Sequence, residues 1–199
     1  LSSEPVNDMP LIEIHPLEKQ DALILADRLF REEGVEVQGD RSHILEVLVE
    51  ETDGFPFYME RVSEKLAESG ASVGPEQITS RVQAQLADDR DPWEMEHFRS
   101  RLKEYYPGDL TTVNGIELPR RKLAEHLLNH LALAQEPQSI DQVFFAATAT
   151  FELNDRNVII TMLGLLAQDH YLISDERRYY EFRFTLVKRW WRLAQGLES

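Results

Sequence analysis

The chain has 199 residues, of which 42% are hydrophobic and 29% are charged, a balance typical of a folded protein and not of a disordered tail. It contains no cysteine, which excludes disulfide frameworks and thiolate-rich zinc sites. No apolar run is long enough to span a membrane, and no segment has the pattern of a signal peptide, so we expect a cytoplasmic protein without a membrane partner.

The net charge of −15 is unevenly distributed along the chain. Residues 1–108 carry 24 acidic and 11 basic side chains, whereas residues 109–199 carry 12 acidic and 10 basic ones. An excess of negative charge repels a polyphosphate backbone at long range. We therefore expect the first half to oppose nucleic-acid binding, while the second half is able to contact DNA locally.

The first half of the chain predicts a leader followed by five helices. Residues 1–15 combine a polar leader with an isolated β-like run, LIEIH, which needs a partner sheet from elsewhere. Glycine, proline and capping residues then delimit apolar segments with helical spacing. The expected helices are residues 17–33, a segment capped by Asp40, and segments opened by Pro56, Pro75 and Pro92. Pro107-Gly108 ends this helical bundle of residues 16–106.

The second half, residues 115–199, begins with three predicted helices. The first spans residues 118–134, and Ser139 with Gln142 forms a capping-box pattern that opens the second. Asn154 is expected to cap the third. The buried positions of this third helix follow one face and are Ile159, Met162, Leu163 and Leu166.

An aromatic hairpin and a last helix complete the second half. Tyr180, Phe182 and Phe184 alternate with charged residues, as on one face of a strand, and the helical segment TLVKRWWRLAQGL follows. Helices, then a hairpin, then a helix is the order of a winged helix. The expected fold class is mainly α: a helical bundle followed by a winged-helix domain with a small β-hairpin wing.

Two segments resemble parts of a P-loop ATPase of the AAA+/STAND type, close to the archaeal ATPase family. Residues 11–70 are similar to the end of the nucleotide domain and the helical lid that follows it, through IEIHPLEKQDALILADRLF and TDGFPFYMERV. Residues 118–193 are similar to the winged helix after such lids, through DHYLI and FRFTLVKRWWRL. The resemblance implies that residues 16–106 form a lid-like bundle.

The same resemblance implies a nucleotide-sensing role for Gly54, Pro56 and Arg61. Many relatives place an arginine at the start of the third lid helix; here Phe57 stands near that point and Arg61 lies one turn later. An ordinary helix–helix connection explains the glycine and proline equally well. The chain has no Gly-rich phosphate loop ending in Lys-Ser/Thr, so we expect it to be no enzyme and to leave ATP and Mg²⁺ to an upstream ATPase core of the same protein.

The predicted winged helix offers candidate residues for binding DNA or protein. Those on the outer side of its third helix, on its wing and on its last helix are Arg156, Asn157, Thr161, Gln168, Arg177, Arg178, Trp191 and Arg192. Arginine is able to read guanine, and asparagine and glutamine adenine. A solvated face is the alternative. One of Trp190 and Trp191 is expected to anchor the core and the other to be exposed at a partner surface.

Two other pairs favour structural roles over chemistry. His126 and His130 have a metal-chelating spacing without a third ligand, so we expect no metal site. Asp169 and His170 are adjacent and poorly placed to share a proton. The sequence thus predicts a non-catalytic C-terminal portion of an AAA+/STAND-type ATPase that couples a lid to a winged helix; the alternative is a stand-alone protein-interaction or regulatory module.

Overall fold

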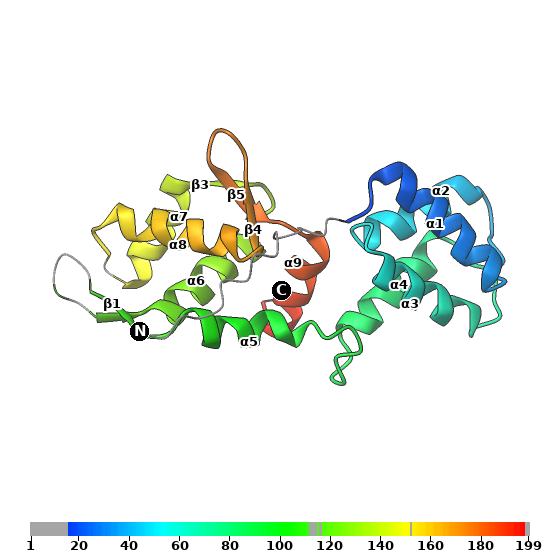
Figure 1. The fold of residues 1–199 in the computed structure, drawn as a ribbon, viewed down its shortest axis with the longest axis horizontal. Helices are drawn as coiled ribbons and strands as arrows, with labels where there is room; N and C mark the ends of the chain where they lie inside the picture. Colours follow the sequence, from blue (N-terminus) through cyan, green and yellow to red (C-terminus); the bar gives the residue numbers. More distant parts are fainter. Residues whose placement is uncertain (1–15, 112–114, 116, 152, 198–199) are drawn as a thin grey trace, which may run out of the picture.

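The computed structural model describes residues 16–111, 115, 117–151 and 153–197. These residues form two lobes joined side by side (Figure 1). We call α1 to α4 the N-terminal bundle, and α5 to α9 with the five short strands the C-terminal region. The predicted mainly helical fold is confirmed. The predicted strand at residues 11–15 lies outside the described residues.

The N-terminal bundle consists of helices delimited close to where the sequence predicts them. Their bounds are α1 Lys19–Glu32, α2 Arg41–Glu51, α3 Pro56–Ala67 and α4 Pro75–Leu86. Asp40 caps α2 as expected, because its Oδ1 accepts the N–H of Ser42 at 3.0 Å. Aliphatic side chains fill the space between the four helices, together with the fully buried ring of Phe30.

The C-terminal region contains five helices and two small antiparallel sheets within the described residues. The helices are α5 Glu96–Tyr105, α6 Arg120–Leu133, α7 Ile140–Phe151, α8 Arg156–Gln168 and α9 Thr185–Ala194. The strands are β1 Asp109–Thr111, β2 Glu117–Pro119, β3 Gln138–Ser139, β4 Leu172–Ser174 and β5 Tyr179–Phe182. β1 pairs with β2, and β5 lies between β3 and β4. The β1–β2 pair, at a Pro-Gly break, was not predicted.

Two predicted helix starts are wrong, for the same physical reason. Helix α5 begins at Glu96 and not after Pro92, because the Asp91 carboxylate accepts the N–H groups of Met95 at 2.7 Å and Glu96 at 2.8 Å. Helix α8 is capped by Asp155 and not by Asn154. In both cases an aspartate carboxylate satisfies free donors in the first turn of the helix.

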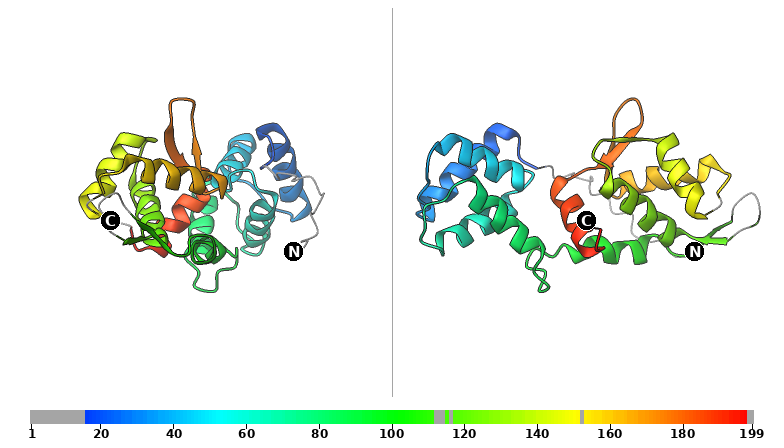
Figure 2. Two further views of the ribbon diagram at one scale, coloured as in Figure 1. Left: turned by 60° about the vertical axis from the view of Figure 1, so that its left-hand side comes forward. Right: turned by 180° about the vertical axis from the view of Figure 1, so that it is seen from behind.

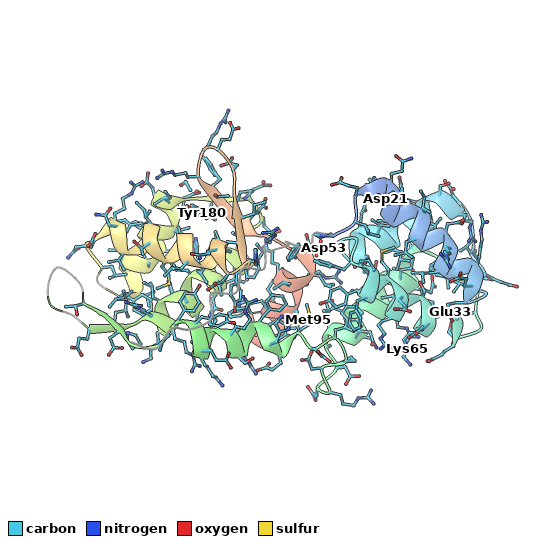
Figure 3. All side chains as sticks on the ribbon, viewed as in Figure 1. Asp21, Glu33, Asp53, Lys65, Met95 and Tyr180 are labelled. Atoms are coloured by element: carbon cyan, nitrogen blue, oxygen red, sulfur yellow. The ribbon has the colours of Figure 1, made fainter. Side chains whose placement is uncertain are left out.

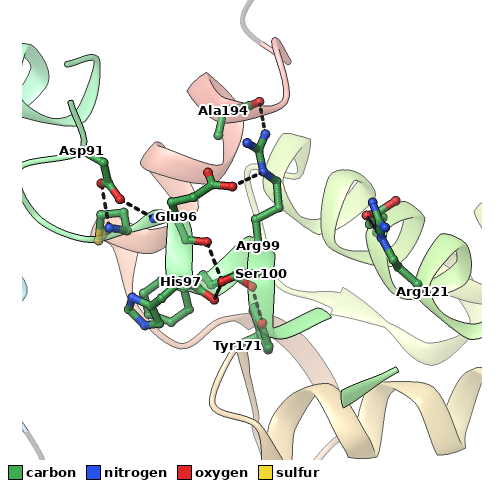
Figure 4. A network of polar contacts seen from close by, with 11 residues as sticks. Asp91, Glu96, His97, Arg99, Ser100, Arg121, Tyr171 and Ala194 are labelled. Atoms are coloured by element: carbon green, nitrogen blue, oxygen red, sulfur yellow. Dashed lines mark hydrogen bonds and ion pairs between the residues drawn. The ribbon is translucent and has the colours of Figure 1, made fainter. Parts of the chain in front are cut away.

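Helix α5 packs against the rest of the C-terminal region, beneath α6 in the view of Figure 1. The Tyr106 hydroxyl donates to the Asp169 carboxylate at 2.7 Å, and the Tyr171 hydroxyl donates to the backbone carbonyl of Phe98. Figure 4 shows a further contact, in which Arg99 pairs with Glu96 and also donates to the carbonyl of Ala194 at 3.4 Å. The predicted boundaries of the domains stay predictions.

Other predicted features of the C-terminal region are confirmed. Ser139 and Gln142 exchange the two capping-box hydrogen bonds, at 2.8 and 3.3 Å. The predicted inner face of α8 is buried. Tyr180 and Phe182 face the core while Tyr179 and Glu181 face outward.

In the part of the chain that the structure describes, no helix has the length and apolar character to cross a membrane.

Candidate functional site

The turn between α2 and α3 is tightly built around Gly54, one of the predicted nucleotide-sensing residues. Asp53 and Gly54 both have positive φ, 50° and 68°. The carbonyl of Gly54 accepts the N–H of Leu17 at 3.3 Å, so the turn holds the beginning of the described chain. A Cβ at Gly54 would lie 3.2 Å from the carbonyl oxygen of Leu17. The position therefore requires glycine for both its conformation and its space.

Pro56 and Arg61 lie on the exposed side of the same helix end. Pro56 is the first residue of α3, where its fixed φ suits the helix. Arg61 pairs with Glu64 at 3.1 Å, and its guanidinium lies 5.5 Å from the ring centre of Phe57. Gly54 and Pro56 thus lie at the start of α3, whereas Arg61 lies further along, in the half of the helix nearer the turn, and is held along the helix surface by two neighbours.

The same turn is the junction with the C-terminal region, and Figure 3 shows Asp53 between the two lobes. The N–H of Leu186, in the first turn of α9, donates to Asp53 Oδ2 at 2.6 Å. Further along α9, Arg189 pairs with Glu51 and donates to Gln83 at 3.3 Å.

Burial raises the pKa of the Asp53 carboxyl. The N–H groups of Leu186 and Thr185, the Thr185 hydroxyl and the charge of Arg189 act in the opposite direction. Burial also raises the pKa of Tyr58, beside this turn, to about 12, and the nearby carboxylates of Asp91 and Asp53 add to the shift. Asp53 is therefore a half-buried carboxyl group whose hydrogen-bond donors come from the other lobe.

A cavity of about 400 Å³ lies on another side of α9, bounded by the end of α4, the start of α5 and Trp190. Three of the carboxylates that line it are engaged by the protein itself. Arg90 lowers the pKa of Asp88 to about 2, Asp91 caps α5, and Glu96 pairs with Arg99. The cavity leaves part of α9 without packing against the bundle.

The predicted partner-binding residues of α8 lie together on one exposed face. Asn157, Thr161 and Gln168 are exposed at positions that repeat every four or seven residues. Arg156, at the start of this face, forms an exposed ion pair with Asp141 of α7 at 2.6 Å. The middle of the face, which also contains the exposed Leu165, is therefore uncharged.

The predicted wing residues lie at the tip of the β4–β5 hairpin, which projects away from the helices (Figure 1). Arg177 and Arg178 are both exposed there, and Arg178 has a φ of 60°. Strand β4 packs against α8, so the base of the hairpin lies beside this helix. The predicted α8 residues share one exposed face, and the two predicted wing arginines lie together at the hairpin tip.

The expectation that one tryptophan is exposed is wrong. Trp190 is 5% and Trp191 0% exposed. Trp191 packs beside Phe182 and donates its Nε1–H to Asn129 Oδ1 of α6 at 2.8 Å. Trp191 therefore holds α9 in the core and does not reach a partner, because two neighbouring rows of α9, one ending in each tryptophan, are both buried. Arg192 is half-buried, and its Nε has no hydrogen-bond partner among the described residues.

His126 and His130 are half-buried side chains of α6 in the C-terminal region. The Nε2 atoms of both are buried without a partner among the described residues, and the ring of His126 meets Phe151 edge-on at 5.0 Å. Burial lowers the pKa of both side chains. Across the described residues, no three metal-ligating side chains gather in one place.

Asp169 and His170 directly follow α8, and each makes its own contacts. Asp169 accepts from Tyr106, and its backbone carbonyl accepts from Arg101 at 3.3 Å. His170 has a φ of 65° and its Nδ1 lies 2.8 Å from Nη1 of Arg183. The pair anchors α5 and the hairpin.

Sequence reasoning missed the role of Asp53 and Arg189. Asp53 lies 133 residues before Leu186, and Arg189 lies 138 residues after Glu51. No local pattern connects residues so far apart. The one available signal was that α9 starts after Phe184, which has no side-chain acceptor to cap its own helix.

No protein-family model matches the sequence, and none of the curated proteins is similar to it. The fold is similar to that of the Walker-type ATPase paby2304 of Pyrococcus abyssi, with a TM-score of 0.59 and 15% sequence identity. The similarity covers 89% of this chain and 42% of that chain, so this protein spans less than half the length of its structural neighbour. The chain is thus similar in fold to part of a Walker-type ATPase.

Proposed function

We propose that this chain is the lid and winged-helix part of an AAA+/STAND-type P-loop ATPase. The observation that carries the proposal is the similarity of 89% of the chain to part of a Walker-type ATPase. Helices α1 to α4 serve as the lid, and their Thr52–Pro56 turn faces an upstream nucleotide domain. The chain itself holds no phosphate loop, so ATP and Mg²⁺ bind to that upstream domain and this part is not an enzyme.

The elements after α5 follow the order of a winged helix. Three helices, α6 to α8, are followed by the β4–β5 hairpin, and β3, which precedes α7, pairs with β5. We assign α8 and the hairpin tip as the surface that contacts a partner. This surface has an uncharged centre, and the chain carries a net charge of −15, so a protein partner is favoured.

Duplex DNA is the second candidate partner, favoured by Arg177 and Arg178 at the exposed hairpin tip. Arginines at this position are able to neutralise phosphates, and each neutralised phosphate makes binding more salt-dependent. Anisotropy titration of the full chain on duplex DNA at low salt decides between the partners. Binding that falls on reversal of both charges, but not on reversal of Arg28 in the bundle, would favour DNA. Absence of binding would favour protein.

The lid assignment is tested in the longer protein that includes the residues encoded upstream. Arg61 and Arg28 are matched, since each is exposed and pairs with a glutamate of its own helix, Glu64 or Glu32. Arg61→Ala should slow ATP hydrolysis more than Arg28→Ala, because only Arg61 lies at the turn end of α3. Equal rates would remove the sensing assignment. The present chain should show no heat of ATP–Mg²⁺ binding by calorimetry, and micromolar binding would contradict its non-catalytic role.

A further inference from the structure

We propose that the Asp53 carboxylate is a positioning residue that fastens the N-terminal bundle to the first turn of α9 and thereby sets the position of the β4–β5 hairpin. A movement of the Thr52–Pro56 turn is then passed to the hairpin through α9. That this movement reports nucleotide state rests on the function proposed above, whereas the fastening itself does not.

The contact is a helix cap supplied from the other lobe. The first N–H groups of a helix have no partner within the helix, and a side-chain oxygen commonly satisfies one of them. Phe184, at the cap position of α9, has no side-chain acceptor, and Asp53 Oδ2 accepts the N–H of Leu186 instead. A carboxylate is also favoured at the positive end of the helix dipole. Asp53 therefore gives α9 the cap that its own sequence lacks.

Contacts beside Asp53 also join the N-terminal bundle to α9. Glu51 pairs with Arg189 of α9 and also accepts the hydroxyl of Thr79 at 2.9 Å, which ties the pair to α4. The rings of Phe55 and Phe184 meet edge-on, with centres 4.8 Å apart. The bundle therefore contacts this helix at three places, which are the N-terminal cap of α9, Arg189 one turn later, and the ring of Phe184 just before the helix. Figure 2 shows from behind that α9 lies between the lobes.

The turn that carries Asp53 is itself held by two backbone hydrogen bonds of the next residue, Gly54. The N–H of Gly54 donates to the carbonyl of Val49 at 2.9 Å, and its carbonyl accepts from Leu17. Because the backbone of the turn is fixed in this way, a movement of the turn displaces the Asp53 carboxylate with it. A shift of the Leu17–Gly54 pair therefore either moves α9 with it or breaks the Asp53–Leu186 hydrogen bond.

The route from α9 to the hairpin is short. Phe184 directly precedes α9, and Phe182 ends β5 two residues earlier. The N–H of Arg183, between them, donates to the carbonyl of Tyr171 at 2.9 Å, which ties this link to the residue before β4. The cavity beside Trp190 lies between another part of α9 and the end of α4. Release of Asp53 therefore removes one of the contacts that hold α9, and the hairpin joined to it, against the bundle.

The experiment measures the distance between the lobes in the full chain. The chain has no cysteine, so Ile24→Cys on α1 and Phe145→Cys on α7, 62% and 78% exposed, provide two sites for spin labels. Double electron–electron resonance should give one narrow distance distribution in the otherwise unchanged chain. Asp53→Ala should broaden it, whereas Asp53→Asn should preserve it, because an amide oxygen accepts the same N–H.

A matched control separates fastening from a general loss of stability. Asp40→Ala removes a cap of the same kind from α2, within the bundle, and should leave the distance distribution narrow. If Asp53→Ala fails to fold, Arg189→Gln tests the same junction from α9 and should broaden the distribution. A narrow distance distribution in folded Asp53→Ala overturns the proposal. If Asp53→Ala does not fold, a narrow distribution in folded Arg189→Gln overturns it. Broadening in Asp40→Ala equal to that of the junction variant also overturns it. None of these outcomes depends on nucleotide or partner, so they leave the proposed function to its own test.

Discussion

Both lobes of this protein bury aliphatic side chains, but they differ in the large rings that they bury. The N-terminal bundle buries aliphatic side chains such as Leu48, Met59 and Ile78, which contact one another without hydrogen bonds. The C-terminal region buries large rings that also carry polar atoms, among them Trp191 and Tyr171. Each of these two donates to a group on another element, Asn129 on α6 or Phe98 on α5.

The difference affects how each lobe specifies its structure. Aliphatic packing is non-directional and tolerates exchange of side chains of similar volume. A buried ring with a hydrogen-bond donor requires a partner in one place, because an unpaired buried donor is costly. We therefore expect the C-terminal region to be the less tolerant of substitution and the more sensitive to pH.

The largest expected effect is at Trp191. Trp191→Ala should destabilise the C-terminal region by about 3–5 kcal/mol, because it leaves a ring-sized cavity and an unpaired Asn129. Met59→Ala, the comparable change in the bundle, should cost about 2–5 kcal/mol. Hydrogen exchange read by residue should show each loss confined to its own lobe. Equal loss of protection in both lobes would mean that they unfold as one unit.

A smaller loss is expected for Gly54→Ala, at the turn shared by the lobes. The left-handed backbone conformation costs a residue with a Cβ roughly 1–2 kcal/mol, and contact with the Leu17 carbonyl oxygen adds to it. Gly164→Ala on the open face of α8 is the control, and should be slightly stabilising. Urea unfolding of both variants checks the order, and a neutral Gly54→Ala would contradict the observed turn.

Two helix caps offer a matched comparison of the lobes at about 1 kcal/mol each. Asp40→Ala removes the cap of α2, and Asp155→Ala removes that of α8, where Oδ1 accepts the N–H of Asn157 at 2.9 Å. Because the two caps have the same geometry, their losses should agree even though the cores differ. Thermal unfolding measures both, and a cap loss several times larger in one lobe would show that its helices depend more on local than on tertiary contacts.

The smallest expected effect is a pH dependence confined to the C-terminal region. Burial lowers the pKa of His126 and His130, so the unfolded chain, with histidine pKa values near ~6.5, binds more protons than the folded one as pH falls. The stability that these histidines contribute is present above that pH and is lost as pH falls through their lowered pKa values. His126→Gln with His130→Gln should flatten the profile of urea midpoint against pH between 7.5 and 5.5. An unchanged slope would remove this assignment.

Much of the fold could be predicted from the sequence. Helices α1 to α4 were expected within a few residues of their observed bounds, since proline, glycine and capping residues act locally. The inner face of α8 and the alternation of β5 followed from their periodicity. Predictions failed where two signals competed, as at Pro92 and Asp91. A proline favours a helix start, but the carboxylate that reaches the free N–H groups decided where α5 begins.

Some features of the candidate site could likewise be predicted from the sequence, and others could not. The sequence by itself determined that Gly54 and Pro56 form a turn, and that the outer residues of α8 share a face, because both follow from residues close together in the chain. Only the tertiary structure decided that Trp191 is buried and that Asp53 caps α9. Caps, ion pairs and burial between distant residues depend on how whole helices pack, and no local pattern in the chain records that packing.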